Sequence, residues 1–221
     1  MAARIIEWHG VRRDSAYAPG ATALLLVDMQ RIWIEPGRDA HRPAGTEDYF
    51  QAQLDTVVVP NAVRLLHAAR TARIDVVHTL IRSATPDGRD RSLDHKLSDI
   101  HVPPDAPEGD IIASLSPAAD EIVLPKTSSG VFNSTNLDYL LRNLGIKFLI
   151  VAGIVTDQCV DMAVRDGADR GYLVTCVHDA CATYSAARHA AALAAFGGYC
   201  WTADTDTVVH RLRHLAPRQI G

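Results

Sequence analysis

Short apolar runs alternate with helical repeats along most of this chain, and this alternation limits the fold more than any other feature. One run, "TALLLVDM", is almost wholly apolar up to an aspartate, which is typical of a strand buried on both faces of a parallel sheet. Runs of this kind cover residues 22–29, 74–81, 121–126, 147–154, 172–180 and 199–204. Because strands that alternate with helices form parallel sheets, we expect helices on both faces and right-handed crossovers.

Apolar residues recur at helical spacing in the intervals between these runs. The expected helices cover residues 57–72, 135–145, 157–172, 185–198 and 205–215. The whole pattern predicts one domain over residues 1–221, with an α/β fold of three layers, α/β/α, that is Rossmann-like. The sheet is expected to be six-stranded and mainly parallel, with strand order 3-2-1-4-5-6.

Two connections, residues 31–55 and 82–110, are longer than is usual between neighbouring elements. Loops of this length are often functional. The first follows the first predicted strand and contains Trp33, Tyr49 and Phe50, whose rings could exclude water. We therefore expect residues 31–55, called the lid segment below, to cover part of a site at the end of that strand.

The composition excludes several classes of function. The 221 residues carry a net charge of −4 with scattered basic residues, which argues against a nucleic-acid or membrane partner. We see no signal peptide and no run long enough to cross a bilayer, so the expected location is the cytoplasm. The four cysteines match no zinc-ligand spacing, and free thiols are expected in a reducing compartment.

Three chemically useful side chains fall at the ends of predicted strands. Asp28 ends the first strand, Lys126 ends the third, and Cys159 stands just past the fourth, where a helix begins. Ligands of open parallel sheets bind at the carboxyl edge, near the point where the strand order reverses. Since the first and fourth strands are neighbours at that point, we expect the three side chains to face one crevice.

These three side chains suit acyl transfer. A cysteine attacks as a thiolate, and a helix N-terminus with a nearby lysine would lower the pKa of Cys159 below that of an exposed thiol. Asp28 could remove the thiol proton, and Lys126 could hold Asp28 and stabilise the negative charge. The alternative is that Cys159 is a packed core thiol, since free cysteines are among the most buried residues.

Three stretches, "LLLVDMQ", "LPKTSSGVFNST" and "GIVTDQCV", resemble motifs of the isochorismatase-like cysteine hydrolases in the same order. This superfamily includes nicotinamidases, N-carbamoylsarcosine amidohydrolases, and biuret and ureidoacrylate hydrolases. The resemblance implies that Asp28, Lys126 and Cys159 form a catalytic triad. It also implies a cis peptide between Ile154 and Val155, with the N–H groups of Val155 and Cys159 forming the oxyanion hole.

The sequence departs from two branches of this superfamily. Nicotinamidases carry an Asp-x-His pair and a further His after the second strand to hold a metal, whereas this chain reads "VVHTLIRSATPDGRD" there. His78 stands alone, so we expect no metal and a substrate other than nicotinamide. Isochorismatases that cleave a vinyl ether lack the cysteine. We therefore expect hydrolysis of a C–N bond in a small amide, carbamoyl, ureido or lactam compound through a thioester, without an organic cofactor.

Other residues have alternative interpretations. Trp33 and Phe132 are candidate pocket walls, and Arg82 is a candidate ligand for a substrate carboxylate or carbonyl. Either aromatic residue could equally be ordinary core, and Arg82 could be solvated. Asp179 is interpreted as a structural hydrogen-bonding group, and His189 as a capping or packing residue.

The alternative function is that of a non-catalytic Rossmann-like protein that binds a ligand or senses oxidant through Cys159. Phosphoryl transfer through Asp28 fits poorly, because Gln30 stands where a second aspartate would be needed. The resemblance also leads us to expect a homo-oligomer, either a dimer or a tetramer.

Overall fold

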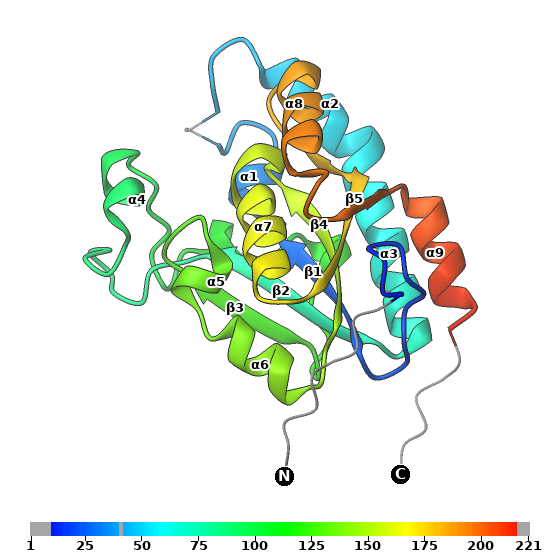
Figure 1. Ribbon diagram of the computed structural model, residues 1–221. Coiled ribbons are helices and arrows are strands. Elements are labelled where there is room, and N and C mark those ends of the chain that lie inside the picture. Colours follow the sequence, from blue (N-terminus) through cyan, green and yellow to red (C-terminus); the bar gives the residue numbers. More distant parts are fainter. Residues whose placement is uncertain (1–9, 40–41, 216–221) are drawn as a thin grey trace.

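The six strands form one sheet in the order β3-β2-β1-β4-β5-β6, and the paired strands run parallel. The structure, a computed structural model, describes residues 10–39 and 42–215. The predicted α/β architecture and strand order are confirmed (Figure 1). The strands are β1 (Thr22–Val27), β2 (Asp75–Ile81), β3 (Ile122–Lys126), β4 (Phe148–Ile154), β5 (Leu173–Ala182) and β6 (Trp201–Ala203).

Helices of very different length connect the strands. Ser185 and Asp204 act as N-caps, because their side chains accept the backbone N–H groups of Arg188 and Thr207. The α-helices are α1 (Arg31–Ile34), α2 (Glu47–Gln53), α3 (Val59–Ala72), α4 (Leu93–Leu97), α5 (Val131–Ser134), α6 (Leu137–Asn143), α7 (Asp161–Asp169), α8 (Ala186–Phe196) and α9 (Thr205–Arg213). Two π-helical turns, η1 (Leu54–Val58) and η4 (Thr156–Val160), precede α3 and α7. None of the described helices is long and apolar enough to span a membrane.

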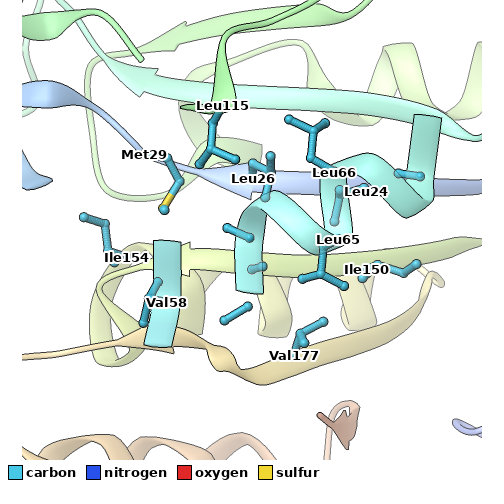
Figure 2. Packing of buried hydrophobic residues seen from close by; sticks show 14 of the residues in the cluster. Leu24, Leu26, Met29, Val58, Leu65, Leu66, Leu115, Ile150, Ile154 and Val177 are labelled. Carbon is cyan, nitrogen blue, oxygen red and sulfur yellow. The ribbon is translucent and has the colours of Figure 1, made fainter. Parts of the chain in front are cut away.

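Two hydrophobic cores lie on opposite faces of the sheet. On one face, Leu24 and Leu26 of β1 pack with Leu65 and Leu66 of α3, as Figure 2 shows. The alternate residues of β1 enter the other core, together with buried residues of α5, α6, α7 and α8. Successive side chains of a strand point to opposite faces, so a strand covered on both sides must be apolar throughout. This explains the continuous apolar runs in the sequence.

A glycine lets the two central strands approach closely beside the site. Gly153 near the end of β4 has φ +128, and a Cβ atom there would lie 2.2 Å from the backbone oxygen of Val27. Any other residue would push β4 away from β1 at this point. Gly153 therefore keeps the end of β4 close to the residue that follows Val27, which is Asp28.

Candidate active site

The carboxyl edge of the sheet brings Asp28, Lys126 and Cys159 together. Asp28 follows β1, Lys126 ends β3, and Cys159 lies in the η4 turn after β4. The ammonium of Lys126 lies 2.8 Å from Oδ2 of Asp28 and 3.4 Å from Sγ of Cys159. The three residues are 2%, 0% and 6% exposed, respectively. The sequence predicted this juxtaposition from the strand order alone.

Asp28 is held from two sides. Its backbone adopts a left-handed conformation with φ 54, which ends β1 and turns the chain. The Asp28 N–H donates to the backbone oxygen of Thr79 at 3.2 Å, and the Thr79 hydroxyl donates to Oδ1 of Asp28 at 2.8 Å. Because Thr79 occupies one carboxylate oxygen and Lys126 the other, the orientation of the carboxylate is fixed.

Lys126 is a fully buried ammonium surrounded by oxygen and sulfur. It donates to the backbone oxygens of Ser128 and Ser129 at 3.0 and 3.3 Å, in addition to Cys159. Burial lowers the pKa of Lys126, but the charges of Asp28 and Cys159 and the hydrogen bonds to them outweigh this effect, so the pKa is raised. Lys126 therefore keeps its positive charge in the site.

The thiol of Cys159 is protonated in the resting site. Burial raises its pKa to about 12, the charge of Lys126 opposes this only in part, and Asp28 raises it further. The predicted lowering of this pKa is therefore wrong, because removal from water disfavours the thiolate more than Lys126 favours it. A base must take the proton before Cys159 can attack, and the Asp28 carboxylate lines the same cavity and shares the Lys126 ammonium with the thiol.

The peptide bond between Ile154 and Val155 is cis, as the resemblance implied. Ile154 and Val155 line the same cavity as Cys159. The expected oxyanion-hole residues therefore border the space in front of the thiol.

A small cavity of about 60 Å³ opens onto Cys159 and Asp28. Its walls come from the lid segment, from the ends of β2 and β4, and from the loops that follow β2 and β5. The lining residues are Asp28, Trp33, Asp39, Phe50, Ile81, Ile100, Ile154, Val155, Gln158, Cys159 and Tyr184. Trp33, Asp39 and Phe50 belong to the lid segment, so its predicted position over the site is confirmed. Trp33 is a pocket wall, as predicted.

Gln30 fastens the lid segment to the sheet. Its side-chain amide donates to the backbone oxygens of Ile81 and Gly109 at 3.0 and 2.7 Å. Its oxygen accepts the Ile81 N–H at 2.8 Å and the indole N–H of Trp33 at 2.9 Å. Sequence reasoning missed this role, although a glutamine two residues after Asp28 in an apolar context was a signal that it is buried.

Two predicted substrate-binding residues lie outside the cavity. Arg82 donates to the backbone oxygen of Ala106 at 3.1 Å and to Oδ1 of Asp110 at 2.8 Å, so it braces the loop after β2. Phe132 belongs to the core under α5 and stacks on Tyr172 with ring centroids 6.0 Å apart. The assignment of both residues to substrate is corrected accordingly, since nearer partners within the fold engage them.

Two of the histidines make contacts within the fold. His78 is buried at β2, and its Nε2 lies 3.1 Å from Oε2 of Glu121. Nδ1 of His189 lies 2.8 Å from the hydroxyl of Thr156, which agrees with its interpretation as a packing residue. Asp179 accepts the N–H and hydroxyl of Thr205, so its structural interpretation is confirmed. Within residues 10–39 and 42–215, no group of three His, Cys, Asp or Glu side chains is placed to hold a metal.

Comparison with known proteins decides the family. The family model described as "Isochorismatase domain" matches residues 22–207. The chain belongs to the isochorismatase family. It is 31% identical over 219 residues to ureidoacrylate amidohydrolase RutB of Serratia proteamaculans (strain 568), covering 89% of this chain and 85% of that protein. It is also 27% identical to the RutB of Klebsiella pneumoniae (strain ATCC 700721 / MGH 78578), with 91% of each chain covered.

Solved structures show the same isochorismatase-like fold. A cysteine hydrolase from Pseudomonas syringae pv. phaseolicola 1448A has a TM-score of 0.77 and 27% identity, covering 90% of this chain and 95% of that one. The N-carbamoylsarcosine amidase of Thermoplasma acidophilum shares the fold with a TM-score of 0.65 at 24% identity, covering 84% of this chain and 97% of that one.

Proposed function

We propose that this protein is a cysteine-dependent amidohydrolase that cleaves a C–N bond of a small amide, carbamoyl, ureido or lactam compound. It is a hydrolase acting on carbon–nitrogen bonds other than peptide bonds, and Cys159 carries the acyl group. The observation that carries the proposal is the contact of one buried ammonium, Lys126, with both Asp28 and Cys159 at 2.8 and 3.4 Å. The relatives named ureidoacrylate amidohydrolase support the reaction class.

Asp28 acts first as base and then as acid. It takes the thiol proton as Sγ of Cys159 attacks the substrate carbonyl carbon, and the N–H groups of Val155 and Cys159 hold the resulting oxyanion. Protonated Asp28 then gives this proton to the leaving nitrogen, and the C–N bond breaks to leave a thioester. Asp28 next takes a proton from a water molecule as the water oxygen attacks the thioester carbon, and the C–S bond breaks to release the carboxylic acid. Asp28 then returns this proton to Sγ of Cys159, which restores the thiol and the carboxylate.

Lys126 acts by charge rather than by proton transfer. Its ammonium stabilises the negative charge that passes between Asp28 and Cys159, and its raised pKa keeps it charged while it does so. This order of proton transfers is compatible with the raised pKa of Cys159, because the thiolate exists only while Asp28 holds the proton.

The test is to trap the acyl-enzyme during turnover. A panel of ureido acids, carbamoyl amino acids, primary amides and lactams is screened for release of ammonia or amine, and the reacting protein is quenched for intact-mass analysis. We expect an added acyl mass that maps to the peptide containing Cys159 and disappears in Cys159→Ser. The matched control is Cys200→Ser, another buried thiol that lies outside the cavity. Turnover by Cys159→Ala at near wild-type rate would refute the assignment.

We also propose a cytoplasmic location and a homo-oligomeric state, either dimer or tetramer. The location is supported by the four cysteines, all of which are free and buried. The oligomeric state is supported by exposed leucines on α4, which are considered in the Discussion.

A further inference from the structure

The cavity in front of Cys159 is too small to hold a whole substrate molecule. Its volume is about 60 Å³, roughly the volume that two water molecules occupy in the liquid. A single carboxamide or urea group fills this space, and most of the wall around it is apolar. The remainder of a substrate must therefore extend out of the cavity through its opening.

An adjoining hollow of about 530 Å³, called the vestibule below, provides the room for that remainder. Ile100, Gln158 and Tyr184 line both the cavity and the vestibule, so these three residues form the neck between them. Gln158 is exposed, whereas Ile100 and Tyr184 are half-buried. The width of the neck therefore depends mainly on Ile100 and Tyr184.

The ring of Tyr184 is held by two neighbouring side chains. Its centroid lies 4.9 Å from that of Phe50 in the lid segment, and the guanidinium carbon of Arg188 lies 5.1 Å from it. Arg188 is itself paired with Asp157 at 2.6 Å. Aromatic and cation–π contacts of this kind favour one orientation of the ring. Tyr184 is therefore a rigid wall of the neck.

Asp157 ties this wall to the nucleophile. The hydroxyl of Thr183 donates to Oδ1 of Asp157 at 2.6 Å, and Arg188 pairs with Oδ2 at the same distance. Asp157 lies in the η4 turn, two residues before Cys159. Because Thr183 and Arg188 stand on either side of Tyr184 in the sequence, the position of its ring relative to the thiol is fixed.

Ile100, the other half-buried residue of the neck, is anchored through its backbone. Its N–H donates to the backbone oxygen of His95 at 2.9 Å, and its own oxygen accepts from the guanidinium of Arg91 at 2.9 Å. The neck thus has two anchored walls, one from the loop after β5 and one from the loop after α4. It can widen only if these contacts break.

We propose that Tyr184 is a specificity-determining residue that restricts the substrate to open-chain amides, carbamoyl compounds or ureas whose reacting group is attached to an unbranched chain. This inference rests on the proposed function and narrows its substrate class. A branched carbon next to the reacting group would meet the fixed ring at the neck, and closely packed walls tolerate little added volume. Lactams are excluded for the same reason, because their ring carries the carbonyl group and cannot pass through the neck.

The test begins with binding of neutral compounds to the Cys159→Ser protein, measured by calorimetry. Propylurea, isopropylurea and tert-butylurea differ in branching beside the urea group, and butyramide and 2-pyrrolidinone compare an open chain with a lactam. We expect propylurea to bind at least about tenfold more tightly than tert-butylurea, with isopropylurea between them, and butyramide to bind more tightly than 2-pyrrolidinone by a similar factor. In wild-type protein, kcat/KM for the three ureas, measured by ammonia release, should follow the same order.

Three variants assign the preference to the ring. Tyr184→Ala removes the ring and should narrow both gaps by about tenfold, because the branched and cyclic compounds then bind more tightly. Tyr184→Phe keeps the ring and should keep the preference, which separates the shape of the ring from its hydroxyl. Arg188→Met keeps the ring but removes its cationic neighbour, so it should narrow the gaps by a smaller factor even if Tyr184→Ala does not fold.

The control is Tyr139→Ala, which removes an exposed tyrosine on α6 and should leave both preferences unchanged. Equal binding of branched and unbranched ureas, no binding of any of the five compounds, or a preference that both Tyr184→Ala and Arg188→Met leave intact would each overturn the inference. These outcomes are separable from failure of the proposed function, because binding is measured without turnover and the thioester on Cys159 is detected independently by mass.

Discussion

At the scale of single residues, the chemistry depends on where the thiol proton goes. Cys159 lies in contact with a lysine, and contact with a cation was expected to lower its pKa. Burial of the whole triad has the larger effect and raises that pKa to about 12. The triad therefore holds a neutral thiol beside a carboxylate that is paired with Lys126. Asp28 removes the thiol proton during the reaction, so a low pKa of Cys159 is not required.

This arrangement predicts how Cys159 reacts with alkylating agents in the absence of substrate. With a pKa near 12 the thiolate fraction, and hence the rate of alkylation by iodoacetamide, should rise by about tenfold per pH unit from neutral to mildly alkaline pH. The rate is measured by mass spectrometry of the Cys159 peptide. The cysteines outside the cavity should react more slowly. A plateau near neutral pH would show that the thiol is already ionised and would contradict the assignment.

The role of Asp28 gives a second prediction. Asp28→Asn is nearly isosteric but its amide cannot accept the thiol proton, so kcat should fall by roughly 10²–10⁴-fold. The Asp28→Asn/Cys159→Ala double variant should be scarcely slower than either single variant, because the residues act as one unit. Asp169→Asn, an exposed carboxylate on α7, serves as control. Losses that multiply in the double variant would show that the two residues act independently.

At the scale of elements, the sequence predicted the strands and helices that have regular apolar spacing. It did not predict structure that depends on contacts between residues far apart in the chain. The strands and the long helices α3, α8 and α9 follow from apolar spacing and caps. The triad was predictable because strand order alone places the ends of β1, β3 and β4 at one edge. The short helices α1, α2, α4 and α5 were not, since they lie within loops or at their ends and their sequences carry no long repeat.

The missed and misplaced site residues have the same cause. Asp39 lies in the lid segment, and nothing local in the sequence indicates that its carboxylate is buried against the cavity. Arg82 directly follows β2 at the carboxyl edge of the sheet, where the site lies. Its guanidinium nevertheless forms an ion pair with Asp110, at the other end of the loop, at 2.8 Å. Contacts between residues so far apart in sequence are set by folding as a whole.

The attachment of the lid segment through Gln30 is testable. Gln30→Glu would place a carboxylate oxygen against the backbone oxygens of Ile81 and Gly109, which now accept from the amide. The free energy of unfolding should fall by about 2–3 kcal/mol, and kcat/KM should fall as Trp33 loosens. Urea unfolding and steady-state kinetics measure the two effects. Gln53→Glu, a half-buried position at the end of α2, is the control, and equal losses in both variants would contradict the role of Gln30.

At the scale of the whole molecule, one surface bears apolar side chains that no described residue buries. Helix α4 projects from the body of the molecule in Figure 1, and its Leu93 and Leu97 are 71% and 79% exposed. Four residues apart, they lie on the same side of the helix. Asp94 and Ser98, from α4 and its end, line the vestibule, the hollow of about 530 Å³ that shares Ile100, Gln158 and Tyr184 with the cavity. A surface that covers α4 would therefore also border the route to Cys159.

The expected homo-oligomer can be tested at the two exposed leucines of α4. If a second copy of the chain covers α4, replacing both leucines in Leu93→Ser/Leu97→Ser removes apolar area from the interface and should shift the protein to a smaller assembly. Light scattering coupled to size-exclusion chromatography measures the mass of the wild-type protein and of the double variant over a range of protein concentrations.

Tyr139→Ser, at a position on α6 that is 67% exposed, controls for the loss of an exposed apolar side chain elsewhere. Because α4 borders the vestibule, dissociation should also raise KM more than it lowers kcat. A wild-type protein that is monomeric at all concentrations, or a double variant of unchanged mass, would show that α4 is not the interface.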